Sequence, residues 1–122
     1  YKTVHIEASV LKKMILQDVL PAAFSYEKEL LTIASLSSCQ TLESEIAGAL
    51  QTYCRQLYEK TILLEELLSS SHDPNPHTCA LQYQTNILPC MKEIRAYADQ
   101  LEEIIPTKKW PYPSYYQLLY HL

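Results

Sequence analysis

The sequence predicts an all-α fold: an elongated antiparallel three-helix bundle with kinked long helices and a short fourth helix at its C-terminal end. The 122 residues, a usual size for one domain, contain a single glycine, Gly48. Folds rich in β-structure need many tight turns, and tight turns favour glycine. Hydrophobic residues make up 48% of the chain, enough for a packed core. Apolar residues also recur at steps of three and four along three long stretches, as on the buried face of a helix.

The first helix is expected from Val4 to Leu36. Pro21 lies inside it, and an interior proline removes one backbone hydrogen bond and clashes with the preceding turn. We therefore expect a kink near Gln17–Pro21, with the helix continuing beyond it because the apolar stripe continues. The stripe comprises Val4, Ala8, Leu11, Ile15, Val19, Ala22, Tyr26, Leu30 and Ile33.

The second helix is expected from Gln40 to Leu68, after a short connection over Ser37–Gln40. Helices joined by so short a loop pack as antiparallel neighbours. The expected buried stripe is Leu42, Ile46, Ala49, Tyr53, Leu57, Leu64 and Leu68, widened by Leu50, Ile62, Leu63 and Leu67.

The third helix is expected from His77 to Ile105, after a loop of serines and prolines over Ser69–His77. Asn75 followed by Pro76 predicts an N-cap with proline at the first helical position, and Pro89 predicts a second kink. The expected inward positions are Ala80, Gln84, Ile87, Met91, Ile94, Ala98, Leu101 and Ile105. All are apolar except Gln84.

The last segment, Pro106–Leu122, is interpreted as a docking tail of this single helical domain. Its prolines forbid one continuous helix, while Ser114 and Gln117 form a capping-box pattern that predicts a short helix from Ser114 to His121. So apolar a segment needs a surface to cover it, on this bundle, another domain or another subunit. The interface candidates are Trp110, Tyr112, Tyr115, Leu118 and Leu119.

Arg95 and Asp99 are added to these interface candidates because they are one helical turn apart. They represent either a contact with a partner surface or an exposed ion pair within one helix, and the sequence leaves both readings open.

Several function classes are disfavoured by composition. The net charge is −4 and no run of Lys or Arg exceeds two residues, so we expect no nucleic-acid partner. No apolar run is long enough for a membrane span, and no signal peptide is recognised. We identify no catalytic, cofactor-binding or metal-binding residues. His72, His77 and Cys79 are the strongest metal candidates, but a polar loop that opens a helix explains them as well.

The four cysteines, Cys39, Cys54, Cys79 and Cys90, leave two alternatives open. They are free thiols in a cytoplasmic protein, which the spacing favours, or two disulfides in an extracellular helical signalling bundle. A small bundle that binds a metal or another small ligand is the remaining alternative.

Three stretches, residues 5–31 (HIEASVLKKMILQDVLPAAFSYEKELL), 87–105 (ILPCMKEIRAYADQLEEII) and 110–122 (WPYPSYYQLLYHL), resemble the C-terminal region of type III glutamine synthetases, the long bacterial form of that enzyme. The terminal WPYPSY is the most specific piece, because helix periodicity does not require it. The chain departs from the family in having Cys90 where a small residue is usual, and in ending on Tyr120-His121-Leu122.

The resemblance implies that the chain is a non-catalytic accessory and assembly domain. Since Tyr1 already lies inside a periodic segment, we interpret the chain as the C-terminal fragment of a longer polypeptide. The implied parent is a cytoplasmic ligase of nitrogen metabolism that makes glutamine from glutamate, ammonia and ATP with Mg²⁺ or Mn²⁺. Its catalytic residues would lie upstream. Its implied partners are the catalytic domain of the same chain and neighbouring subunits of a homo-oligomer, a dodecamer by resemblance.

Overall fold

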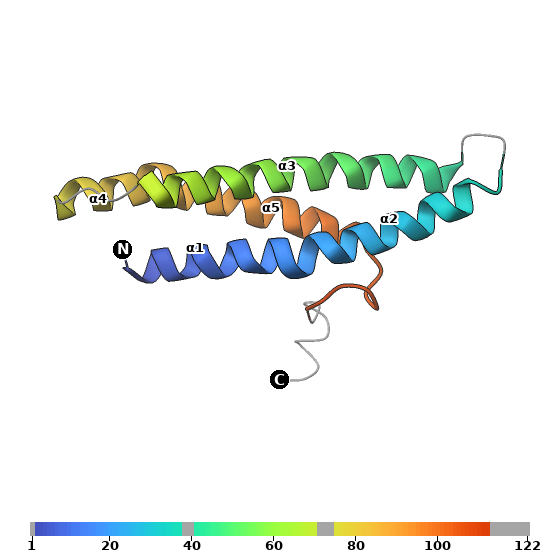
Figure 1. Cartoon of the computed structure of the whole chain (residues 1–122), viewed down its shortest axis with the longest axis horizontal. Helices are drawn as coiled ribbons and strands as arrows, with labels where there is room; N and C mark the ends of the chain where they lie inside the picture. The colour runs from blue at the N-terminus through green and yellow to red at the C-terminus, as the bar shows by residue number, and fades with distance from the viewer. Residues whose placement is uncertain (1, 38–40, 71–74, 113–122) are drawn as a thin grey trace.

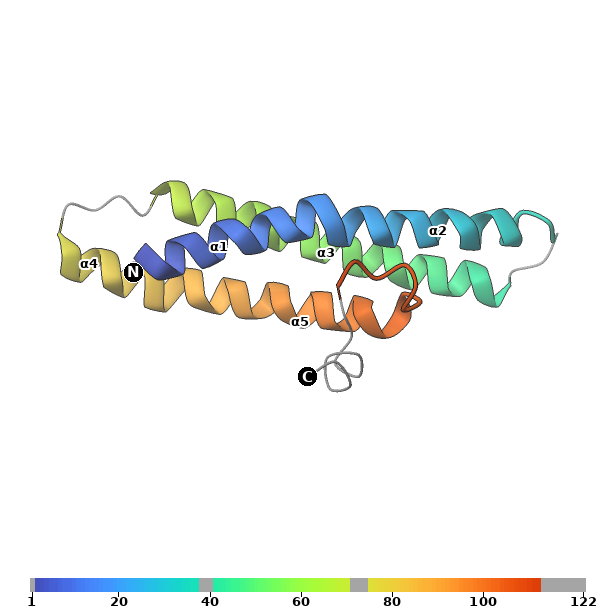
Figure 2. The same cartoon turned by 90° about the horizontal axis from the view of Figure 1, so that it is seen from below.

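Three antiparallel helical rods make up the structure (Figures 1 and 2). The computed structural model describes residues 2–37, 41–70 and 75–112, and over these ranges it contains no strand. The first rod runs through α1 (Lys2–Met14), the π-helical turn η1 (Ile15–Val19) and α2 (Leu20–Ala34). The second is α3 (Leu42–Ser70), and the third runs through α4 (Pro76–Gln82), η2 (Tyr83–Ile87) and α5 (Leu88–Ile104). The predicted all-α class is confirmed, whereas the fourth helix expected at Ser114–His121 lies outside the described residues.

Both interior prolines follow directly on a π-helical turn. The backbone N–H of Leu20 donates to the carbonyl of Ile15, one residue before Pro21, and the N–H of Leu88 donates to the carbonyl of Tyr83, one residue before Pro89. A proline has no N–H to donate and clashes with the carbonyl four residues back. The wider π turn relieves this conflict by adding one residue to the turn. The first rod accordingly bends between α1 and α2 without breaking (Figure 1).

The extra residue of each π turn changes which side chains face the core. After η1 the buried residue is Ala23, whereas Ala22 is half-buried and Ile33 is exposed. In the third rod, Cys79 of α4 and Tyr83, the first residue of η2, are buried. The predictions for Ala22, Ile33, Ala80 and Gln84 were therefore wrong, and the last two side chains are exposed. A uniform step of three or four residues cannot account for a turn that contains one residue more.

The buried face of α3 also differs from the prediction in its N-terminal half. Ala47, Leu50 and Cys54 are buried, whereas Leu42 and Ala49 are exposed and Ile46 and Tyr53 are half-buried. Beyond Leu57 the expected Leu64 and Leu68 are buried, as is Thr61, whose hydroxyl donates to the Leu57 carbonyl at 2.8 Å. In a chain rich in apolar residues, adjacent helical stripes compete, and the neighbouring helices select one of them.

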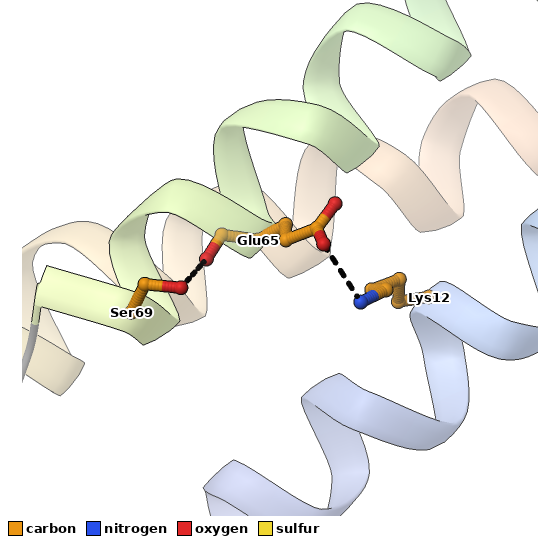
Figure 3. Close-up of polar contacts among 3 residues, drawn as sticks. All are labelled: Lys12, Glu65 and Ser69. Atoms are coloured by element: carbon orange, nitrogen blue, oxygen red, sulfur yellow. Dashed lines mark hydrogen bonds and ion pairs between the residues drawn. The ribbon is translucent and has the colours of Figure 1, made fainter.

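α3 packs against both other rods, through α2 and α5. Polar pairs on its surface join α3 to the first rod. Lys12 Nζ of α1 lies 3.2 Å from Glu65 Oε1, and the backbone carbonyl of Glu65 accepts from the Ser69 hydroxyl at 3.0 Å (Figure 3). Further along, Gln51 Nε2 donates to Glu27 Oε1 at 2.6 Å.

The N-cap predicted for the third helix is confirmed. The Asn75 side chain accepts from the backbone N–H of His77 at 3.0 Å, and Pro76 is the first helical residue. Near the start of η2, the Tyr83 hydroxyl and His5 Nδ1 of α1 form a hydrogen bond of 2.8 Å. This bond joins the third rod to the first at the residue where η2 begins.

Exchanging Tyr83 and Gln84 for alanine tests the position of the π turn. Tyr83 is 4% exposed, so Tyr83→Ala should lower the free energy of unfolding by about 3 kcal/mol or more. Gln84→Ala should change it by less than about 0.5 kcal/mol. Urea unfolding followed by circular dichroism measures both free energies. A larger loss from Gln84→Ala would show that Gln84 faces the core, as expected for a helix without the π turn.

Candidate functional site: the groove between α1 and α5

A groove of about 510 Å³ runs between α1 and α5. Its volume is within the range of small-molecule sites. α1, η1, α5 and the segment after α5 form its walls, whereas α3 contributes none of the lining residues. The groove is lined by Ile6, Glu7, Val10, Leu11, Met14, Ile15, Val19, Arg95, Ala98, Asp99, Glu102, Trp110 and Tyr112.

The floor of the groove exists because α1 carries two apolar stripes. Ala8, Leu11 and Ile15 face the core and are buried. Ile6, Val10 and Met14 follow one another at steps of four residues on the neighbouring face. Ile6 is 63% exposed and Val10 is 51% exposed, so the second stripe is open to solvent among the described residues. Its spacing is visible in the sequence, although our sequence analysis, which followed a single stripe, missed it.

The segment after α5 closes one end of the groove. The chain turns at Pro106, whose carbonyl accepts from the N–H of Lys109 at 2.9 Å and of Trp110 at 3.1 Å. It then crosses to the first rod (Figure 2). Lys109 Nζ lies 2.5 Å from Glu29 Oε1 of α2. The indole of Trp110 meets the ring of Tyr112 edge to face, with the centroids 6.3 Å apart.

Tyr112 anchors this segment to η1. Its hydroxyl donates to Asp18 Oδ2 at 2.6 Å, and its ring packs against the core. Burial of the phenol and the hydrogen bond to the Asp18 carboxylate together raise the pKa of Tyr112 well above its usual value. The phenol therefore stays neutral and remains a donor through the physiological pH range.

Carboxylates dominate the rim of the groove. Glu7 of α1 and Asp99 and Glu102 of α5 line it, and Arg95 is the basic side chain among the lining residues. An apolar floor with an acidic rim suits an apolar occupant that carries hydrogen-bond donors and no negative charge.

The structure brings four of the predicted interface residues together. Arg95, Asp99, Trp110 and Tyr112 all line the groove. The sequence placed them in two separate segments, and only the turn at Pro106 makes them neighbours. Tyr115, Leu118 and Leu119 lie outside the described residues.

Cys54 and Cys90 are buried free thiols, and Cys79 is buried as well. Burial raises the pKa of Cys54 to about 11, and it also raises the pKa of Cys90. Protonated thiols are poor nucleophiles and poor metal ligands at neutral pH. Because two disulfides would use all four cysteines, these free thiols argue against the disulfide-linked signalling bundle.

The metal candidates do not form a site in the described part of the chain. His77 is exposed and Cys79 is buried, while His72 lies outside the described residues. Within residues 2–37, 41–70 and 75–112, no group of three His, Cys, Asp or Glu side chains is placed to hold a metal ion. In the same ranges, no helix is long and apolar enough to cross a membrane.

Comparison with known proteins shows that this chain is similar to part of the glutamine synthetases. The family described as the glutamine synthetase C-terminal domain matches residues 1–38. A glutamine synthetase from Butyrivibrio fibrisolvens is 31% identical over 99% of this chain. The type-3 glutamine synthetase of Dictyostelium discoideum is 28% identical over 98% of it, and a glutamine synthetase from Bacteroides fragilis (strain YCH46) is 24% identical over 96%. No solved structure gives a significant match.

These matches confirm the resemblance to type III glutamine synthetases, and the chain corresponds to the C-terminal part of those enzymes. It spans 18% of the length of each of the three relatives. The relative from Dictyostelium is eukaryotic, so the family is not confined to bacteria.

Replacing Tyr112 by phenylalanine tests the anchor at the end of the groove. Tyr112→Phe should cost about 0.5–1.5 kcal/mol of stability near neutral pH. A raised pKa means that the folded chain holds the phenolic proton more tightly than the unfolded chain. The stabilisation is therefore complete below the ordinary tyrosine pKa of about 10 and decreases as the pH rises above that value.

Thermal unfolding of the unsubstituted chain and of the Tyr112→Phe variant across this pH range measures the difference in stability. Asp18→Asn is the matched variant, because it weakens the same bond from the other side, and the double variant should lose little more than either single one. A Tyr112→Phe cost that stays constant up to about pH 11 would contradict the assignment.

Proposed function

We propose that this chain is the C-terminal accessory and assembly domain of a glutamine synthetase. The observation that carries the proposal is the match over almost the whole chain to the C-terminal part of proteins named glutamine synthetase. An elongated bundle with little but apolar side chains at its inward positions suits a structural role.

In this proposal the parent enzyme joins ammonia to glutamate, using ATP and Mg²⁺ or Mn²⁺. The groups that bind these substrates belong to the part of the parent before residue 1, and this chain supplies no catalytic residue. The parent is a cytoplasmic homo-oligomer, a dodecamer in line with the resemblance. The domain contacts the catalytic domain of its own chain and a neighbouring subunit.

The exposed face of α2 is the surface that we assign to the contact with a neighbouring subunit. α2 and α3 continue beyond the end of α5 in both views, so this end of the bundle consists of two helices (Figures 1 and 2). Leu31 is 43% exposed, and Phe24 of the same helix is 53% exposed. They line a shallow depression of about 550 Å³, together with Glu27, Lys28, Thr32 and Ser35. Apolar side chains in an exposed hollow are typical of protein interfaces.

The full-length gene product provides the test of the proposed function. It should form glutamine from glutamate, ammonia and ATP, and deletion of residues 1–122 should change its oligomer mass or its activity. A coupled assay for glutamine and light scattering on the same preparations measure both properties. A full-length protein that forms no glutamine would refute the proposal, and a deletion that changes neither mass nor activity would refute the accessory and assembly role.

A single charge on α2 tests the assembly surface. Leu31→Asp in the full-length protein should lower the oligomer mass measured by light scattering, because a carboxylate would have to be desolvated in the contact. Leu63→Asp on α3 is the matched control, since Leu63 is 40% exposed and Leu31 43% exposed. Equal masses for the two variants would show that the α2 face is not the contact.

A further inference from the structure

The groove between α1 and α5 has the lining of a small-molecule site. Most of its lining residues are apolar and a few are charged, which is the usual composition of a pocket for a drug-sized ligand. Ile6 and Val10 are more than half exposed, so the floor of the groove offers apolar surface to an occupant. The charged side chains then decide which kind of ligand the groove selects.

We propose that this groove binds a small amphipathic amine, an organic cation whose charged nitrogen lies at Asp99 and Glu102 and whose apolar chain runs along α1 toward Val10. The proposal rests on the shape, the lining and the charges of the groove. It does not depend on the proposed role in a glutamine synthetase.

Asp99 and Glu102 supply the charge that selects a cation. They are three residues apart on α5 and both line the groove, so their side chains share one face of the helix. Glu102 is half-buried. Neither carboxylate takes part in an ion pair among the described residues. Both are therefore available to a ligand, and a partly desolvated carboxylate attracts a cation more strongly than one in bulk water.

The remaining charged residues leave the groove acidic. Glu7 adds a third carboxylate, and Arg95 is the one basic side chain among the described lining residues. Three negative charges thus face one positive charge. An anionic ligand of the same shape would be repelled, whereas a cation is attracted.

Trp110 adds an aromatic ring to the same groove. The indole ring attracts cations more strongly than the other aromatic side chains, through the negative face of its π system. Tyr112 meets this ring edge to face and is itself held by its hydrogen bond to Asp18. An ammonium group therefore finds carboxylates and an anchored aromatic pair in one groove.

The segment after α5 limits the length of the occupant. It crosses from α5 to the first rod (Figure 2), where the Tyr112 hydroxyl donates to Asp18 Oδ2 of η1 at 2.6 Å. A long helix laid along α1 would collide with this crossing segment, whereas a small ligand ends before it. We therefore assign the groove to a small molecule and not to a helix of a partner protein.

Photoaffinity labelling of the full-length gene product tests the site. The probe is decyltrimethylammonium with a diazirine on its alkyl chain, used below its micelle-forming concentration, and digestion with mass spectrometry locates the label. We expect label within residues 6–19 and 95–112. Unlabelled decyltrimethylammonium should compete for this label at least about tenfold better than decanoate, which has a chain of the same length and a negative charge.

The exposed face of α2 is the internal control for apolar attraction alone. Phe24 and Leu31 line its depression together with one carboxylate, Glu27, and one ammonium group, Lys28, so its charges balance. Equal labelling of this face and of the groove would overturn the proposal, because apolar contact would then explain both. Equal competition by decanoate and by the cation, or no label in the groove, would overturn it as well.

Two matched pairs of variants locate the two ends of the ligand. Glu102→Gln should weaken competition by decyltrimethylammonium about fivefold, whereas Glu103→Gln, on an exposed residue of α5 that does not line the groove, should leave it unchanged. Val10→Lys places a positive charge in the floor and should also weaken it, whereas Leu63→Lys on α3 should not.

Circular dichroism of each variant shows whether the helices are intact. With folded proteins, equal affinities within either pair would overturn the proposal. None of these measurements bears on whether the protein forms glutamine, so this proposal and the proposed function fail separately.

Discussion

Pro21 and Pro89 impose the constraint on which the packing of the bundle depends. Each proline lacks a backbone N–H to donate, and its ring clashes with the carbonyl four residues back in the same helix. The chain meets this demand with η1 and η2, and each π turn rotates the following part of the helix relative to the part before it. The buried position of Tyr83, and with it the bond to His5, results from this rotation.

The same constraint contributes to the groove. α1 packs inward through Ala8 and Leu11, and η1 through Ile15, while Ile6 and Val10 of α1 stay at the surface. η1 then presents Asp18 where the segment after α5 returns, and Tyr112 binds it. An uninterrupted helix would orient Asp18 differently relative to α1. The proline that bends the first rod thereby also affects where the end of the described chain attaches.

Apolar side chains line two separate surfaces of the described domain. One is the groove between α1 and α5, and the other is the α2 face with Phe24 and Leu31, which we propose as the contact with a neighbouring subunit. The chain spans 18% of the length of its glutamine synthetase relatives, and a contact with the rest of such a protein is part of our proposal.

The sequence predicts the helical class, the three rods, the cap at Asn75 and the positions of both interruptions, because periodicity, capping chemistry and proline sterics are local. It also determined the family resemblance, through motifs such as WPYPSY. The tertiary packing selects which of two adjacent stripes is buried, since Ala47 and Tyr83 face the core where Ile46 and Gln84 were expected. It alone brought Arg95 and Asp99 next to Tyr112, because a groove depends on how separate helices and a returning segment meet in space.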